Sequence, residues 1–476
     1  MFDRLAIIVC FIAFLLLFTG VGLYSAKRHQ NTTADYLLAS RNVNPWLTGL
    51  SAFATAHSGG MFISTIGYTY LVGISSAWLF LGWFLGDYIA WFFVHKRLRE
   101  VSEQNASETI GSFLAGTPSK DTASVRRVDR LIPIISALIT IAFLGAYAAA
   151  QLLAGSKALH AIFGWNYSFG IILGAVIVVI YCFSGGIRAS IWTDAVQSVL
   201  MMFAMLMLLA VALNACGGWE GLWVQLKTID PALVDPIPQN LQFGFSLFLI
   251  SWLVAGFGVV GQPHIMVRAM VLDSPKNMGL TRNIYAFSYV VFSTAAILVG
   301  LTARVLMPDL IAGGDVELAL PQMTLQLLPA FWIGIILAGI FSAVISTADS
   351  QILACSAALT QDIFLHTAKS YRLAKIGTLV VTAIILAIAL ASDKNMFALG
   401  IFAWSALGSG LGPILVVRAW QLPLNPWVGV TMMVSGIVAA AIWNAGLKLS
   451  GSVYEVLPGM AVGFLVYAIA RWWEKH

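Results

Sequence analysis

Apolar residues run in long stretches, most of them close to 20 residues, along the whole 476-residue chain. A stretch of this length crosses a bilayer as an α-helix, because each residue adds about 1.5 Å and the hydrocarbon core is about 30 Å thick. Charged residues make up only 10% of the chain, against about 25% in ordinary soluble domains. The sequence therefore predicts an all-α integral membrane protein and excludes a water-soluble one.

The apolar stretches predict 13 transmembrane helices. The first is too long for the apolar region of a signal peptide, and its basic residues Lys27 and Arg28 follow it. It is therefore expected to remain as a membrane span. The predicted spans lie near residues 5–25, 46–71, 75–95, 131–160, 167–184, 191–214, 243–267, 280–306, 324–365, 374–392, 396–417, 427–446 and 453–472.

The basic residues predict the orientation. Of the 26 Lys and Arg residues, all but six fall on one side if the N-terminus is outside, and such an excess marks the cytoplasmic side. We therefore expect an external N-terminus, a cytoplasmic C-terminus, a cytoplasmic loop at 98–127 and a bacterial cytoplasmic membrane. The six residues expected outside are Arg4, Lys157, Lys227, Arg304, Lys394 and Lys448.

The loops between the spans limit the possible functions. None exceeds about 30 residues, which is too short for a soluble catalytic domain, and the spans carry no protease or ATPase motif. The net charge of +5 comes from basic residues beside apolar spans, so nucleic acid is not an expected partner. The expected partners are the bilayer, a cation and a small solute. The sequence predicts no enzyme and no particular oligomeric state.

Two spans carry helix-breaking residues in their middle. The second contains the small and polar segment Ser51–Met61, with Gly59, and the seventh contains Gly258, Gly261 and Pro263. Proline disfavours helix in the residue before it, and glycine weakens a helix locally. Both residues also allow close helix packing. Paired breaks in corresponding positions nevertheless favour an inverted-repeat transporter with a midplane binding site.

Counting spans from the two breaks divides the chain. Five spans lie within 46–215 and five more within 243–420. One span precedes them in 1–45, and two follow in 421–476. The whole of 1–476 is thus predicted to form a single transporter domain.

Five short motifs, in this order, resemble the solute:sodium symporter family and most of all its sodium/proline symporter branch. The resemblance implies the leucine-transporter type fold, with a 5+5 inverted repeat plus one extra N-terminal and two extra C-terminal helices. It also implies sodium as the co-transported ion and alternating access. The motifs are Asp35–Arg41 (DYLLASR), Ser51–Gly59, Gly185–Gln197 (GGIRASIWTDAVQ), Gly261–Arg268 (GQPHIMVR) and Ser346–Leu353 (STADSQIL).

Hydroxyl groups in the ninth span are candidates for binding sodium. Ser342, Ser346 and Ser350 recur every four residues and so share one helical face, and Thr347 adjoins Ser346. Alternatively, such hydroxyls bond back to carbonyls of their own helix or hold helices together. The resemblance implies a main sodium site made of the carbonyls of Ala54, His57 and Ala343 and the hydroxyls of Ser346 and Thr347.

Asp194 and Asp349 are the informative acidic residues, because both fall inside predicted spans. A charge at the centre of a span costs about 2.5–3.5 kcal/mol, so Asp194 and Asp349 should each face a partner or an ion. The resemblance implies a second cation site at Asp194, Asp349 and Ser350. The alternative for Asp194 is a position near the cytoplasmic helix end, solvated or bonded to Arg188.

The chain departs from the proline-transporter pattern at three positions. Ala56 stands where that branch has an aspartate, and Asp349 is a candidate to supply the missing charge. Ala255 and Val259 replace an expected tryptophan and tyrosine, whereas Tyr147 matches. We therefore expect a pocket of different shape, which suits a solute bulkier than proline.

The solute is expected to bind beside the two breaks. Helix N-termini exposed there attract a carboxylate, which suits an amino acid such as proline or another organic acid. Tyr147 and Gln151 could equally bond between helices, and the isolated His57 and His264 fit packing better than a metal site. The candidate solute-binding residues are Ser58, Gly59, Tyr147, Gln151, Ala255, Val259, Gln262 and Pro263.

The sequence thus predicts a sodium-coupled symporter that imports a small polar organic solute by alternating access. Proton coupling in the same fold is the first alternative, because Ala56 has displaced an acid and Asp349 could titrate. A sensor built on a transporter scaffold is the second. It would be expected to carry a signalling domain, whereas this sequence ends with Arg471–His476 just past the last predicted span.

Overall fold

The computed structural model describes residues 2–28, 30–116, 130–239, 241–310, 316–364, 370–392 and 397–476. Within these ranges the chain is almost entirely helical, and the one pairing of extended backbone is a parallel bridge between Val43 and Leu272. The predicted all-α class is confirmed.

The larger helices, together with the short segments that flank the two breaks, are α1 (Phe2–Ala26), α3 (Pro45–Ala56), α4 (Gly59–Val72), α5 (Ala77–Ala90), α9 (Leu131–Ile139), α10 (Gly145–Phe163), α11 (Tyr167–Ala215), α13 (Gly244–Phe257), α14 (Pro263–Val271), α15 (Met278–Leu306), α18 (Ala330–Ala357), α19 (Tyr371–Ala391), α20 (Phe397–Ala419), α21 (Pro426–Ala441) and α22 (Val456–Lys475). Shorter connecting helices are α2 (Thr33–Leu38), α6 (Lys96–Gln104), α7 (Ile110–Ala115), α12 (Gly218–Ile229) and α17 (Ala319–Leu327). Turns of 3-10 or π geometry are η1 (Ala39–Arg41), η2 (Gly73–Ser76), η3 (Trp91–His95), η4 (Thr140–Leu144), η5 (Pro231–Val234), η6 (Gly258–Gly261), η7 (Pro275–Asn277), η8 (Val316–Leu318), η9 (Ala358–Ile363) and η10 (Ile442–Gly446).

Eleven helical stretches of the described residues are long and apolar enough to cross a membrane. The difference from the predicted 13 lies in two long stretches, Ile63–Gln104 of 42 residues and Tyr167–Ala215 of 49 residues, each of which covers parts of two predicted spans. A straight helix of 49 residues would be about 74 Å long, more than twice the thickness of a bilayer core. The count of 13 stays a prediction.

The long helix α11 changes direction at Gly186, where φ is 56° and ψ is −142°. A side chain at this position would also collide with the neighbouring helix α2, because an added Cβ atom would lie 2.3 Å from the carbonyl oxygen of Tyr36. Only glycine combines this backbone conformation with so close an approach. The kink divides α11 into a half that carries Tyr181 and a half that carries Asp194.

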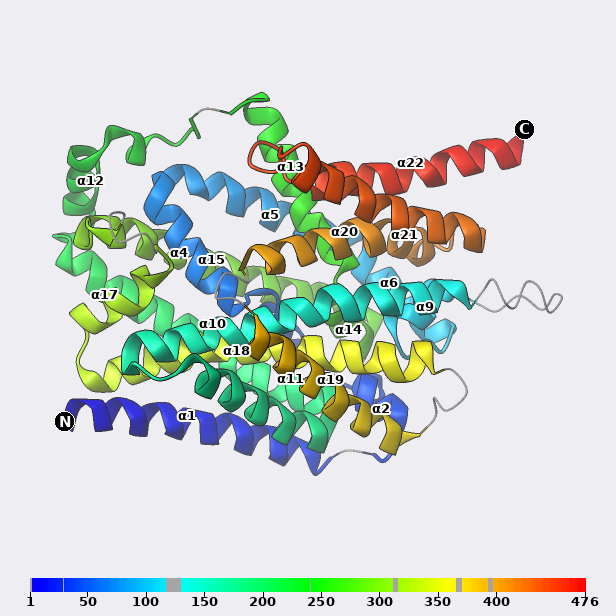
Figure 1. The fold of residues 1–476 in the computed structure, drawn as a ribbon, viewed down its shortest axis with the longest axis horizontal. Helices are drawn as coiled ribbons and strands as arrows, with labels where there is room; N and C mark the ends of the chain where they lie inside the picture. Colours follow the sequence, from blue (N-terminus) through cyan, green and yellow to red (C-terminus); the bar gives the residue numbers. More distant parts are fainter. Residues whose placement is uncertain are drawn as a thin grey trace.

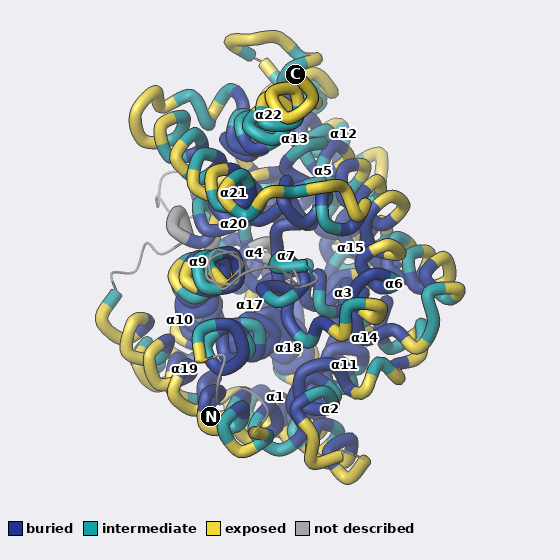
Figure 2. The backbone as a smooth tube through the Cα atoms, turned by 90° about the vertical axis from the view of Figure 1, so that its right-hand side faces the viewer, coloured by how far each residue is buried: buried dark blue, intermediate teal, exposed yellow. Residues whose placement is uncertain are grey.

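The helices run mostly along one direction, and the two termini lie at opposite ends of the bundle (Figure 1). Burial rises toward the middle, where α18 lies, and exposed residues form the rim (Figure 2). The rim carries large apolar side chains such as Leu16, Phe287 and Leu465, which are 56–69% exposed. Such a surface is stable against lipid and unstable against water, so the protein is an integral membrane protein.

Both predicted helix breaks are present. Asn44 caps α3 by accepting a hydrogen bond from the amide of Leu47, the helix ends at Ala56, and α4 begins at Gly59. In the seventh predicted span, α13 gives way to the 3-10 turn η6, and α14 starts at Pro263. The intervening Gln262 is extended, with φ −98° and ψ 98°, as expected before a proline.

Some sequence predictions remain untested by this structure. The division into two five-helix repeats stays a prediction, as does the side on which each terminus lies. The predicted cytoplasmic loop 98–127 contains the end of α6 and all of α7, and its residues 117–129 lie outside the described part of the chain. The same is true of the basic residues Lys120, Arg126, Arg127, Lys369 and Lys394.

Candidate ion and solute sites

The first break frees backbone carbonyls. In an uninterrupted helix the carbonyls of Ala54 and Thr55 would accept from the amides four residues on, at Ser58 and Gly59. Because α3 ends at Ala56, those amides lie beyond the helix, and the two carbonyls are available to other donors.

The hydroxyl groups of α18 reach these free carbonyls. The Ser346 hydroxyl donates to the carbonyls of Ala54 at 3.1 Å and Ala343 at 3.3 Å. The Thr347 hydroxyl donates to the carbonyls of Thr55 at 3.2 Å and Ala343 at 3.1 Å. Oxygens that bind a cation at about 2.4 Å lie about 3.4 Å apart on adjacent corners of the coordination shell. Five oxygens here have nearly that spacing.

Two predicted members of this group need comment. His57 directly follows α3, and its ring packs at 4.5 Å from Phe53 and 4.6 Å from Tyr289 between ring centroids. Its predicted contribution is the backbone carbonyl, which stays a prediction. Ser342 shares the face of Ser346, yet its hydroxyl bonds back to Ala338 at 2.7 Å, as the alternative interpretation expected.

Asp194 on α11 and Asp349 on α18, three residues after Ser346, are completely buried. Asp349 accepts hydrogen bonds from Tyr181 at 2.6 Å, Ser190 at 3.0 Å and Ser350 at 2.8 Å. Tyr181 and Ser190 come from the two halves of α11, on either side of the kink at Gly186. The kink therefore lets one helix hold this carboxylate from two directions.

Asp194 is linked to both α3 and α14. Its Oδ2 atom accepts from Ser51 at 2.7 Å and from Thr55 at 3.4 Å, and it forms an ion pair with Arg268 at 3.2 Å. Arg188, the alternative partner, instead pairs with Asp35 at 2.6 Å. Asp194 is therefore neither solvated nor bound to Arg188.

The position of Arg268 corrects the sequence interpretation, which counted this residue with the cytoplasmic positive charges. Its side chain is 1% exposed and lies at the centre of the acidic network. It donates to the hydroxyls of Ser190 and Ser350, to Asp194 and to the carbonyl of His264. A basic residue just after a helix break resembles a topology signal in sequence, but the short α14 carries it back into the bundle.

The charges in this network do not balance. The two carboxylates carry two formal negative charges, and Arg268 is the only cationic side chain that forms an ion pair with either of them in the described residues. The Oδ1 atom of Asp194 has no hydrogen-bond partner. A buried charge without a counter-charge is costly, so one monovalent cation or one proton would complete the network.

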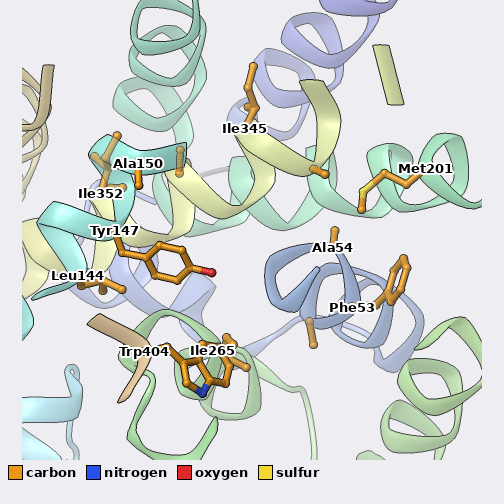
Figure 3. Close-up of a cluster of buried hydrophobic side chains, with 14 of the residues drawn as sticks. Phe53, Ala54, Leu144, Tyr147, Ala150, Met201, Ile265, Ile345, Ile352 and Trp404 are labelled. Atoms are coloured by element: carbon orange, nitrogen blue, oxygen red, sulfur yellow. The ribbon is translucent and has the colours of Figure 1, made fainter. Parts of the chain in front are cut away.

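A cavity of about 280 Å³ starts at the first break. Ser58, Tyr147 and Gln151 line it, and the Tyr147 hydroxyl donates to Ser58 at 3.2 Å. In Figure 3 this hydroxyl points from α10 toward α3. The Gln151 side-chain oxygen has no partner. The aromatic residues of the wall are Tyr68, Phe80, Trp83, Tyr147, Trp252, Trp404 and Tyr454.

The other five predicted solute residues lie around this cavity and do not line it. Gln262 donates to the Trp404 carbonyl at 2.9 Å, and the Trp404 ring donates to the Ala255 carbonyl at 3.2 Å. Gln262 and Ala255 therefore support Trp404, which lines the cavity. Val259 is a core residue, and Gly59 lies against Val344 of α18. Pro263 borders a separate cavity of about 40 Å³, next to Arg268 and Ser350.

Sequence reasoning missed several residues of these sites. Thr55, Ser51, Ser190 and Tyr181 are polar residues of apolar spans, and no spacing rule singles them out. Lys157, which was predicted to lie on the outer side, also lines the solute cavity, a role that was not predicted. Its position three turns beyond Tyr147 on α10 is the signal that could have placed it there.

Freed carbonyls, facing hydroxyls and a cavity at the same break define an ion-coupled secondary transporter. The model of the sodium:solute symporter family matches residues 36–421. A sodium/proline symporter of Staphylococcus aureus strain JH9 is 31% identical over 482 residues, covering 97% of this chain and 92% of the relative. The protein of the bovine strain RF122 is 30% identical over 481 residues, with the same coverage.

The chain belongs to the sodium:solute symporter family. It is accordingly a transporter that couples solute import to sodium, and it is not an enzyme. Solved structures agree on the fold. A Na⁺-coupled sialic acid symporter, in a substrate-bound outward-open state, superimposes with a TM-score of 0.78 at 19% identity and 97% coverage of both chains. The nucleobase-cation-symport-1 transporter Mhp1, closed with bromovinylhydantoin bound, gives 0.55 at 15% identity, covering 92% of this chain and 94% of that one.

Proposed function

We propose that this sodium-coupled symporter imports an amino acid, such as proline, or another carboxylate-bearing solute whose body is apolar. The observation that carries the proposal is the composition of the cavity at the first break. Most of its wall is apolar and seven of its side chains are aromatic, whereas its polar groups are few and include one cation, Lys157. A small zwitterion or organic acid with an apolar body matches such a wall, because apolar surface is buried while a few polar groups fix orientation.

Different residues of the cavity are assigned to different parts of the solute. Tyr147 and Ser58 offer hydroxyls at the inner end of the cavity, and Gln151 offers an amide whose oxygen has no partner. Lys157 attracts a carboxylate. Trp83 and Trp404 pack 5.0 Å apart between ring centroids and form part of the wall for the apolar body. Ala255 and Gln262 hold Trp404 of this wall from behind. Gly59, Val259 and Pro263 belong to the two breaks beside the cavity and do not line it.

Sodium is assigned to two places. The main site takes the carbonyls of Ala54, His57 and Ala343 with the hydroxyls of Ser346 and Thr347, and Thr55 adds a carbonyl. The second site takes Asp194, Asp349 and Ser350. A proton is the alternative occupant of the second site, because one proton balances the same single negative charge.

The first break couples the two ligands. Ala54 and Thr55 turn carbonyls toward α18, and Ser58, three residues on, turns its hydroxyl toward the solute cavity. Sodium that orders this turn also positions Ser58 for the solute. Reciprocal linkage then requires the solute to strengthen sodium binding by the same factor.

The two cavities support alternating access. The large one includes Lys157 and Pro321, on the predicted outer side, and the small one includes Thr109 and Asp362, on the predicted cytoplasmic side. Arg268 and Ser350 of the second site border the small cavity. We assign the N-terminus to the outside, the C-terminus to the cytoplasm and the protein to a bacterial cytoplasmic membrane.

Uptake by reconstituted protein tests this proposal. Proteoliposomes with an inward sodium gradient should accumulate at least one apolar amino acid or organic acid, and uptake should collapse when choline replaces sodium. Gln151→Ala should raise the solute concentration for half-maximal uptake while leaving the half-maximal sodium concentration, measured at saturating solute, largely unchanged. Accumulation of only uncharged sugars, or of no member of an acid panel, would remove the carboxylate from the proposal.

A further inference from the structure

Asp87 is a buried acid that neither ion site uses. It lies on α5, is 1% exposed, and accepts a hydrogen bond at its Oδ2 atom from the hydroxyl of Tyr285 on α15. Its Oδ1 atom has no hydrogen-bond partner. In the described residues no cationic side chain forms an ion pair with it. An isolated buried carboxylate carries a large desolvation cost when it is charged, and binding a proton removes that cost.

The same face of the helix carries further polar groups. Trp91 and His95 follow Asp87 at intervals of four residues, and η3, in which both lie, has π geometry. The Trp91 ring lies 5.1 Å from Tyr285 and 4.2 Å from His95 between centroids. The Nε1 atom of Trp91 has no partner. π-Helical turns inside α-helices are frequent at functional sites.

The charged groups of the surrounding helices point elsewhere. On α15, Arg282 stacks over Phe92 at 3.9 Å, on the outer face. On α6, Arg99 donates to the Leu272 carbonyl and to Glu103. On α14, Arg268 donates hydrogen bonds to the His264 carbonyl and to Asp194, so its charge belongs to the Asp194 network.

The remaining neighbours add no charge. The segments α13, η6 and η2, which also pack against α5, contain no titratable residue. On α15, Tyr289 lies 6.1 Å from Tyr285 between ring centroids and is the second tyrosine on this side. In the described part of the chain, the titratable groups that these contacts place around Asp87 are therefore Tyr285, Tyr289 and His95.

This environment suits a proton and excludes sodium. Sodium requires several oxygen ligands, as the main site supplies, whereas the Tyr285 phenol is the one hydrogen-bond partner of Asp87 in the described residues and aromatic rings lie nearby. A proton needs only the carboxylate itself. His95 lies where α5 continues into Lys96 and α6, at the predicted cytoplasmic side, and so provides a second titratable group between Asp87 and that surface.

Asp87 is also placed to affect the second break. Its neighbour Gly86 packs directly on α13, where an added Cβ atom would lie 1.8 Å from the Leu253 carbonyl oxygen. The helix α13 leads into η6 and the second break. A charge that appears or disappears on Asp87 therefore acts on the contact between α5, α15 and the start of the interrupted helix, and can favour one conformation over another.

We propose that Asp87, held by Tyr285, is a proton-binding site distinct from both sodium sites, and that its protonation controls the rate of sodium-driven transport. The carboxylate takes its proton from water by way of the side where His95 lies and returns it there. No other bond is made or broken. The proposal goes beyond sodium coupling, since it concerns regulation of the carrier by pH.

Infrared pH titration of the purified protein tests the binding step directly. A protonated carboxylic acid has a C=O stretch that disappears on ionisation. Wild type should show one more titrating C=O band than Asp87→Asn, which keeps the shape of the neutral acid. Identical titrations of the two proteins would overturn the proposal. This measurement does not depend on whether the variant transports.

Uptake in proteoliposomes tests the control step. At a fixed sodium gradient, the wild-type initial rate should change between mildly acidic and mildly basic pH, and Asp87→Asn should lose this change while keeping its sodium requirement. Asp87→Glu, the matched control, should keep a pH dependence with a displaced midpoint. A pH profile of Asp87→Asn equal to that of wild type would contradict the proposal. If wild-type uptake did not depend on sodium, that result would count against the proposed transport function instead.

Discussion

Ser346 and Thr347 show how much a residue's role depends on what faces it. Their neighbour Ser342 has the same hydroxyl and the same helical face, but it bonds back to its own helix. Ser346 and Thr347 also bond back to Ala343 of their own helix, but in addition they face the end of α3, where Ala54 and Thr55 have lost their helical partners. The hydroxyl alone is therefore not the signal for an ion site.

The double variant Ser346→Ala and Thr347→Ala should need more sodium for half-maximal uptake. Each lost ligand to a charged group is worth about 1.5–3 kcal/mol, which corresponds to an increase of about tenfold or more. Ser342→Ala is the matched control and should leave the sodium requirement unchanged. An unchanged sodium dependence of the double variant would remove both hydroxyls from the site.

Variants of Asp349 test whether this residue carries a negative charge that relatives carry at the position of Ala56. If it supplies the charge that is absent at Ala56, Asp349→Asn should weaken the coupling of uptake to sodium, because one negative charge of the buried network is lost. Adding Ala56→Asp should restore part of the coupling. The ratio of solute uptake with and without a sodium gradient measures both effects. Full activity of Asp349→Asn, with no gain from adding Ala56→Asp, would show that Asp349 does not supply the charge that is absent at Ala56.

At this scale the motifs led to the prediction of Ser346 and Thr347 but not of Arg268 and Ser190, which lie in two of the other motifs. Arg268 was missed as a site residue because a cation after a break resembles an ordinary topology signal. Tyr181 and Ser190 could not be found, since their role depends on a kink that brings two halves of one helix to the same carboxylate. Contacts of this kind are made by tertiary packing, which leaves no periodic pattern.

Helices in this protein are placed by breaks and by close contacts. Both breaks follow from Gly and Pro residues that were visible in the sequence. The contact between α5 and α13 was not predicted, although it brings the helices so close that a Cβ atom at Gly256 would lie 1.9 Å from the Trp83 carbonyl oxygen. Glycine is common in membrane helices, so its frequency does not reveal which positions form such contacts.

Gly256→Ala should destabilise the folded protein by about 1–3 kcal/mol, the usual cost of forcing an extra methyl group into a packed contact. A lowered thermal unfolding temperature in detergent would report this loss. Gly145→Ala is the control, because an added Cβ atom there meets nothing within 4 Å. Equal unfolding temperatures for the two variants would show that α5 and α13 do not pack as closely as described.

For the whole molecule, composition was sufficient to predict a polytopic membrane protein, and the breaks were sufficient to predict paired interrupted helices. The apolar pattern does not show how many separate helices form, because long helices such as α11 join two predicted spans across a kink without a loop. Orientation rests on the distribution of basic residues alone. It therefore needs a chemical test.

Cysteine labelling tests the orientation. The four native cysteines are buried, so a membrane-impermeant maleimide should react little with the unmodified protein. In intact cells it should label Lys448→Cys, on the exposed turn after η10, and leave Lys475→Cys near the C-terminus unlabelled. The reverse pattern would place the N-terminus in the cytoplasm.

The central claim is that one break binds both sodium and a carboxylate-bearing solute. The most direct test is thermal unfolding of the purified protein with a panel of amino acids and organic acids, each in sodium and in choline buffer at two pH values. A bound ligand raises the unfolding temperature by mass action, and linkage requires sodium and solute to strengthen each other. The account predicts that at least one apolar, carboxylate-bearing solute stabilises the protein in sodium and not in choline. Stabilisation that is the same in both buffers, or that follows pH alone, would contradict it.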